Sequence, residues 1–221
     1  EHIMNAIDYS GIHRSVELFL KTRDGLNNSK NKKMFNVFLK ELTGILCGIA
    51  YDNYIHSNEV KRFLTAVRRH KMRSFNDDGR LHDVSELISK RILNDPLYNL
   101  LEYTLMNYKP GNVQAGPGEV FFCFYNKDST FGIDNTNGFD IIVDDKKTEL
   151  KKLGTNFTNE ELFDKYAADK NCERLLVVKP VSDAKVPLLR SSYACITFKN
   201  KNWREAFDHI GKQGTLVLKE H

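Results

Sequence analysis

The sequence predicts an α/β (α+β) fold, in which a helical N-terminal domain precedes a mixed sheet flanked by helices. Before about residue 110, apolar residues recur at helical spacing. After it, they form short runs rich in β-branched and aromatic residues, which are typical of strands. Segment 109–118 between the two halves is rich in glycine and proline and marks a boundary. We therefore predict a helical domain over residues 1–110 and a sheet domain over residues 111–221.

The helices of the first half are predicted from their apolar positions. Segment 34–51 places Phe35, Phe38, Leu42 and Leu46 on one face. The next helix begins near residue 57, and two further helices are predicted over 83–93 and 96–108. Pro96 suits the first turn of the last one, where its missing N–H is harmless.

The second half alternates predicted strands with predicted helices. The strands lie at 139–145, 147–153, 174–180 and 193–199, and a last edge strand at 214–220. Helices are predicted over 159–169 and 202–211.

Composition restricts the class of protein. Hydrophobic residues make up 41% of the chain, which is enough for a packed core. No uninterrupted apolar run reaches the roughly 18 residues that span a bilayer. The four cysteines form no CxxC pair, so we expect buried free thiols rather than a zinc site. We predict a soluble cytoplasmic protein without membrane contact.

The stretch GFDIIVDDKKTELKK, residues 138–152, reads as a hairpin with unusual charges. A turn centred on Asp145 and Lys146 would set Asp140 opposite Lys151 and Glu149 diagonal to Asp140. Because side chains alternate along a strand, these three would share one face, and Ile141, Val143 and Leu150 would face a core. A one-residue slip would invert the faces.

Two neighbouring carboxylates repel each other, and a divalent cation would remove that repulsion. Oxygen ligands of this kind suit Mg²⁺, with Mn²⁺ as a substitute. The alternative is a surface hairpin with a cross-strand salt pair between Asp140 and Lys151.

Residues 116–180 resemble the PD-(D/E)XK nuclease superfamily, which has the restriction-endonuclease-like fold. The family places an acid on a helix, an Asp at the start of a strand, and (D/E)-x-K on the next strand. The matching residues are Glu119, Asp140, and Glu149 with Lys151. GFDI stands in place of the name-giving Pro-Asp, and GPGE before the helix is similar to some phage-encoded members.

The resemblance implies a Mg²⁺-dependent endonuclease that hydrolyses phosphodiester bonds, most simply in DNA. Asp140, Glu149 and the carbonyl of Leu150 would bind the metal, and Lys151 would help to activate water. Glu119 would be an auxiliary ligand or position the metal-bound water. Asp134 and Asp144 remain alternatives.

A basic segment provides candidate contacts to the phosphates of a nucleic acid. Its members are Lys61, Arg62, Arg68, Arg69, Lys71 and Arg73, although charged helices are most often solvated faces. DNA is the favoured partner, RNA is left open, and double-strand cutting would favour a homodimer. The competing hypothesis is a non-catalytic nucleic-acid-binding or virion structural protein built on a nuclease-like fold.

Overall fold

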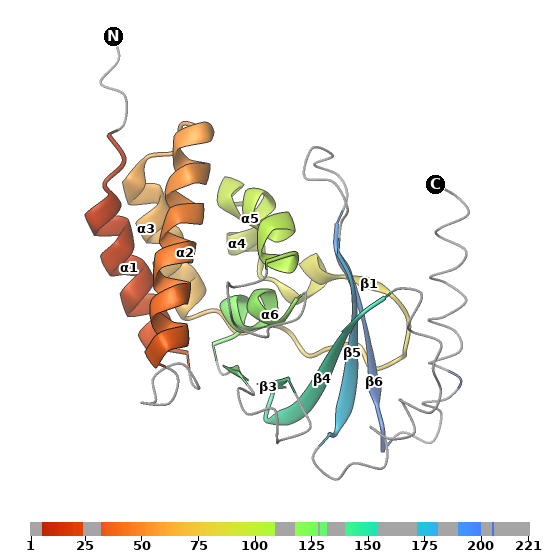
Figure 1. Ribbon diagram of the computed structural model, residues 1–221. Helices are drawn as coiled ribbons and strands as arrows, with labels where there is room; N and C mark the ends of the chain where they lie inside the picture. The colour runs from red at the N-terminus through yellow and green to blue at the C-terminus, as the bar shows by residue number, and fades with distance from the viewer. Residues whose placement is uncertain are drawn as a thin grey trace.

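The computed structural model describes residues 6–23, 32–108, 118–127, 129–131, 140–153, 172–180, 190–199 and 205. Figure 1 shows the long helices α1, α2 and α3 side by side, with α4, α5 and α6 between them and a mixed sheet. The chain therefore has the predicted α/β architecture with an N-terminal helical part.

The three long helices are α1 (Tyr9–Lys21), α2 (Lys32–Asp52) and α3 (Ser57–Arg68). The carboxylate of Asp8 caps α1 by accepting a hydrogen bond from the Gly11 N–H at 3.0 Å. His56 caps α3, because its Nδ1 accepts from the Asn58 N–H at 3.1 Å. Both caps satisfy N–H groups that have no partner inside a helix.

The second group of helices leads from the helical part to the sheet. It comprises η2 (Val84–Leu87), α4 (Lys90–Leu93), α5 (Pro96–Met106) and α6 (Glu119–Tyr125). Pro96 lies in the first turn of α5, as predicted, and Asp95 caps that helix by accepting from the Leu97 N–H.

The sheet has the strand order β1-β6-β5-β4-β3-β2 among the described residues. Its strands are β1 (His82–Asp83), β2 (Thr130–Phe131), β3 (Ile141–Val143), β4 (Lys146–Lys152), β5 (Arg174–Lys179) and β6 (Ser192–Thr197). Strands β4 and β5 are parallel, and the other neighbouring pairs are antiparallel. The sheet is therefore mixed, as predicted.

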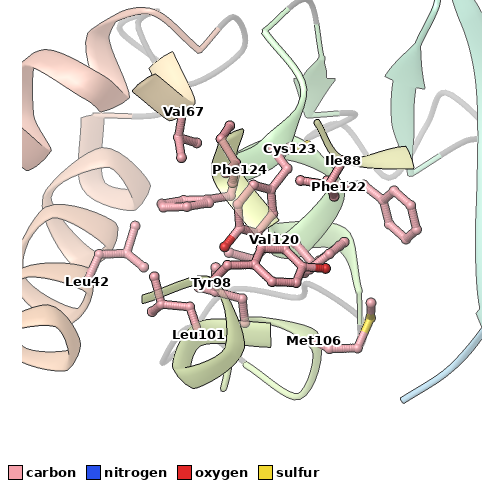
Figure 2. Packing of buried hydrophobic residues seen from close by; sticks show 14 of the residues in the cluster. Leu42, Val67, Ile88, Tyr98, Leu101, Met106, Val120, Phe122, Cys123 and Phe124 are labelled. Atoms are coloured by element: carbon pink, nitrogen blue, oxygen red, sulfur yellow. The ribbon is translucent and has the colours of Figure 1, made fainter. Parts of the chain in front are cut away.

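Side chains alternate between the two faces of the sheet. One face, with Leu150, Leu176 and Val178, joins the same hydrophobic core as the helices. Figure 2 shows part of this core, where Tyr98, Val120 and other buried side chains pack together. The opposite face carries a smaller cluster of Leu175, Val177, Ala194 and Ile196. The core that unites helices and sheet thus lies on one face only.

A buried arginine ties three helices together. Arg23 follows α1 and is 1% exposed. Its guanidinium donates to the carbonyls of Val67 at 3.2 Å, Cys123 at 2.9 Å and Phe124 at 2.9 Å. These carbonyls lie in the last turns of α3 and α6, which favour a cation. The guanidinium also stacks on the Phe19 ring, 4.5 Å from its centroid.

Several further predictions have clear outcomes. The dense aromatic run Phe121, Phe122, Phe124 and Tyr125 is buried core. All four cysteines are free; three are buried, but Cys47 is half-buried and corrects the expectation. The helices predicted over 159–169 and 202–211, the strand over 214–220, and nearly all of the predicted boundary fall outside the described residues.

Among the described residues, α2 alone is long and apolar enough to cross a membrane by length and composition. It contains no uninterrupted apolar run of about 18 residues, because Lys40 and Glu41 lie within it. Within the structure, α2 contributes Phe38, Leu42 and Leu46 to the core.

The turn of the β3–β4 hairpin gives the first testable prediction. Asp144 and Asp145 have φ of 52° and 59°, the left-handed pair that a type I′ turn requires. Glycine adopts this conformation without steric cost. We expect Asp145→Gly to raise the free energy of unfolding by about 0.5–1 kcal/mol, measured by urea unfolding.

Asp145→Val is the matched control, because a β-branched residue is strained at positive φ. It should destabilise the protein by about 1–2 kcal/mol. If Asp145→Gly destabilised the protein and Asp145→Val did not, the assigned turn would be wrong.

Candidate active site on the β3–β4 hairpin

The hairpin forms where the sequence predicts it, but its register differs. The turn is Asp144–Asp145, not Asp145–Lys146, and Ile141 pairs with Thr148. Asp140 directly precedes β3, and its N–H donates to the Thr148 carbonyl at 3.0 Å, so the predicted pairing of Asp140 with Lys151 is wrong. The slip is two residues, and side chains keep their faces after an even slip. Ile141, Val143 and Leu150 are buried in the core, as predicted.

Three functional groups of the motif therefore meet on the face opposite the main core. The Asp140 carboxylate accepts a hydrogen bond from the Leu150 N–H at 2.9 Å. Its side chain also hydrogen-bonds to that of Glu149. Lys151 Nζ lies 3.0 Å from Glu149 Oε1, and the Glu149 side chain is only 8% exposed, compared with 36% for Lys151. The structure thus brings Asp140, Glu149 and Lys151 together.

The environment raises the pKa of Asp140 above its ordinary value of 3.8. Burial is the largest cause, because desolvation disfavours the charged carboxylate. The Leu150 N–H, the Lys151 ammonium and the hydrogen bond with Glu149 oppose it and lower the pKa. Because the net direction is upward, the carboxyl pair retains a proton more readily than an exposed aspartate.

Glu119 comes from α6 and not from the hairpin. It is the first residue of α6 and is buried. The preceding Gly118 has φ of 90°, and a Cβ there would lie 3.2 Å from Val178 Cγ2 and 3.4 Å from Leu150 Cδ2. Both of those side chains belong to the main core, on the face opposite Asp140. Among the described residues, no group of three or more His, Cys, Asp or Glu side chains is placed to hold a metal ion.

The donor set nevertheless suits a single hard cation. In an extended strand the N–H and C=O of one residue point to the same side. Because the Leu150 N–H points at Asp140, its carbonyl lies on that side as well. Two carboxylates and a carbonyl, completed by water and substrate phosphate, are the ligands that Mg²⁺ typically takes. The residues present therefore fit the ion that the resemblance implies.

The other predicted candidates are placed differently. Asp144 belongs to the turn, and Asp134 falls outside the described residues. Next to Lys151, Lys152 is exposed and, by alternation along β4, lies on the face opposite Lys151.

Arg174 is a structural residue of the site that the sequence analysis missed. It is 4% exposed, on β5. Its Nε donates to Thr148 Oγ1 at 2.9 Å, and its Nη2 donates to the Val143 carbonyl at 2.6 Å. One guanidinium thereby holds β3 and β4 in register from the core side. No sequence signal indicates this role, because most arginines are exposed.

The six basic residues predicted to contact phosphates lie in different environments in the structure. Lys61 pairs with Asp8 at 2.6 Å, beside the start of α1. Arg62 is exposed on α3, and Arg68 is half-buried near Arg23, which donates to its carbonyl at 3.3 Å. Arg69, Lys71 and Arg73 are exposed beyond the end of α3. The set therefore does not form a single helical face.

Comparison with protein-family models found no match, and comparisons with curated proteins and with solved structures found none either. The resemblance to the nuclease superfamily rests on the motif residues and on their placement in the hairpin.

The raised pKa of Asp140 gives the second prediction. Folding favours the protonated form of this carboxyl. That preference stabilises the folded state fully at pH values below the pKa that the group has in the unfolded chain. That contribution is lost as pH rises through the raised folded pKa. Asparagine imitates the protonated form, since its oxygen can accept from the Leu150 N–H. In EDTA, Asp140→Asn should therefore match wild type in acid and be more stable at pH about 7.

Thermal unfolding from pH about 3.5 to 8 measures this difference. The control is Asp83→Asn, a change at an exposed position. A destabilised Asp140→Asn at neutral pH would show that the charged carboxylate stabilises the fold.

Proposed function

We propose that the chain is a metal-dependent endonuclease that hydrolyses phosphodiester bonds, with DNA as the favoured substrate. One observation carries the proposal: Asp140, Glu149 and Lys151 meet on one face of the hairpin. Their arrangement combines two carboxyl groups with one adjacent ammonium. Metal-assisted hydrolysis uses groups of these two kinds.

The proposed roles follow from position and charge. Asp140, Glu149 and the Leu150 carbonyl would hold Mg²⁺ or Mn²⁺, which supplies Lewis acidity and a more acidic bound water. The Lys151 ammonium would orient the attacking water or stabilise charge developing on the phosphate. The proposal does not require Glu119.

A non-catalytic nucleic-acid-binding or virion structural protein is the second candidate. Its supporting observation is the contact of Lys151 with Glu149 at 3.0 Å, which a structural salt bridge would also make. On that reading the pair only stabilises the hairpin, by about 0–1 kcal/mol for an ion pair near the surface. The two candidates predict different results for metal binding and for the cleavage activity of Lys151 variants.

Metal binding gives the third prediction. We expect Mn²⁺ titrated by calorimetry to bind wild type, and binding to Asp140→Asn to be weakened at least tenfold. At ten times its Kd, Mg²⁺ should raise the free energy of unfolding of wild type by about 1.4 kcal/mol. Asp83→Asn should behave as wild type, and equal binding by Asp140→Asn and wild type would remove the proposed site.

The fourth prediction concerns Lys151. A guanidinium is planar and always charged, so it replaces an ammonium in a salt bridge but not in a strict catalytic position. We expect Lys151→Arg and Lys151→Ala both to reduce cleavage of circular duplex DNA by at least about 100-fold. Folding should change by no more than about 1 kcal/mol.

Lys152→Ala is the neighbouring control and should keep full cleavage, since Lys152 lies on the other face. The substrates are duplex DNA, single-stranded DNA and RNA, each with Mg²⁺, Mn²⁺ or EDTA. Full activity of Lys151→Ala would exclude the assigned role. Inactive wild type on every substrate with either metal would favour the non-catalytic protein.

A further inference from the structure

We infer that four basic residues from two distant parts of the chain form a strip that binds the phosphate backbone of a nucleic acid. The strip consists of Arg69, Lys71, Arg73 and Lys127, which are all exposed. The inference rests on the proposed function and deepens it, because the strip would hold the substrate of the same site.

The side chains of segment 69–73 alternate between exposed and buried positions. His70 and Met72 are buried, at 8% and 4% exposure, whereas Lys71 and Arg73 are exposed. Lys71 and Arg73 therefore project outward together, and the buried pair anchors the segment from below.

Hydrogen bonds on both sides hold the segment in place. His70 Nε2 accepts from the Ser89 N–H at 3.1 Å, so its Nδ1 donates to the Tyr125 carbonyl at 2.7 Å. The Arg73 N–H donates to the Leu87 carbonyl at 3.0 Å. The segment thus lies between residues 87–89 and the end of α6, and its charges are presented by fixed backbone.

The same bonds bring Lys127 to the segment. The Lys127 N–H donates to the His70 carbonyl at 2.8 Å, and the Met72 N–H donates to Asn126 Oδ1 at 3.2 Å. A fourth cation from the second half of the chain therefore lies beside three from the first half. Linear sequence gave no indication of this neighbour.

The two acids that follow segment 69–73 most closely in the sequence have other structural roles. Residues 60–76 contain no Asp or Glu. Beyond them, Asp77 accepts from the Thr197 N–H at 3.0 Å, and Asp78 contacts His82 at 2.8 Å. Lys61, at the other end of the basic run, is paired with Asp8. Segment 69–73 thus contributes three cations and no acid, which suits a polyanion, and Lys127 adds a fourth cation next to Asp128 in the sequence.

The strip lies near the hairpin at the β2 edge of the sheet. Lys127 precedes β2 by three residues, and Thr130 of β2 pairs with Ile142, two residues from Asp140. Chain geometry therefore limits the distance between the Cα atoms of Lys127 and Asp140 to about 20–25 Å. That distance corresponds to roughly seven base pairs of duplex, so one molecule can reach both places.

The test measures binding separately from cleavage. Labelled duplex DNA, single-stranded DNA and RNA are titrated with the full chain in EDTA, and fluorescence anisotropy gives Kd over a range of salt. Removing three phosphate contacts with Lys71→Ala/Arg73→Ala/Lys127→Ala should lower the salt slope for duplex by about 3. Affinity at about 0.1 M salt should fall roughly 100-fold.

The matched control removes three exposed cations elsewhere, with Arg14→Ala/Lys33→Ala/Lys40→Ala, and its salt slope should change by less than about one. An equal loss in both triple variants would overturn the strip, since only net charge would then matter. If circular dichroism shows that the strip variant is unfolded, Lys127→Glu alone replaces it, with at least tenfold weaker binding expected.

The possible outcomes distinguish a failure of the proposed binding strip from a failure of the proposed nuclease activity. Wild type that binds none of the three nucleic acids at low salt would overturn the strip. Salt-dependent binding through the strip without cleavage would support the strip and oppose the nuclease. Where cleavage occurs, the strip variant should raise KM at unchanged kcat, and an unchanged KM would overturn the strip.

Discussion

The candidate site depends on the buried guanidinium of Arg174. From β5 it donates to the Thr148 hydroxyl on β4 and to the Val143 carbonyl on β3. A slip of one residue between these strands would turn Glu149 and Lys151 into the main core. Burying a cation is unfavourable unless its donors are satisfied, and the Phe75 ring, 4.7 Å from the guanidinium, adds a further favourable contact. The register is thus fixed from the core side, away from the carboxylates.

Arg23 has the corresponding role for the helices. It joins α1 to the ends of α3 and α6, and α6 in turn packs against the sheet through Gly118. The core continues without interruption from the long helices to one face of the sheet. As a result, a single face of the sheet is occupied by the helical part, and the motif residues lie on the other. The division between core and site follows from the way successive side chains of a strand point to opposite faces, which sets Leu150 in the main core and Glu149 and Lys151 on the other face.

Periodicity in the sequence predicted the helices α2, α3 and α5, the strands β3 to β6, and the shared face of Asp140, Glu149 and Lys151. It did not predict α1, and the single helix expected over 83–93 is divided into η2 and α4. It missed the hairpin register, since two consecutive aspartates in the left-handed region are not a strong turn signal. It also missed Arg23 and Arg174, because nothing in their local sequence distinguishes a buried arginine from an exposed one. The basic segment was predicted from the sequence. Only the structure shows that Lys61 pairs with Asp8 and that residue 70 lies beside residue 127.

The balance of effects on Asp140 differs from that on a carboxylate in a stabilising salt bridge. In a stabilising salt bridge the partner cation outweighs desolvation, and the pKa of the carboxyl falls. At Asp140 desolvation outweighs both the Lys151 ammonium and the Leu150 N–H, and the pKa rises. The charged carboxylate therefore makes the folded state less stable at neutral pH than a neutral group would. Retaining such a group is unfavourable for folding alone, whereas a bound cation would reverse the balance by favouring the charged form, which is the physical basis for proposing a metal at this pair.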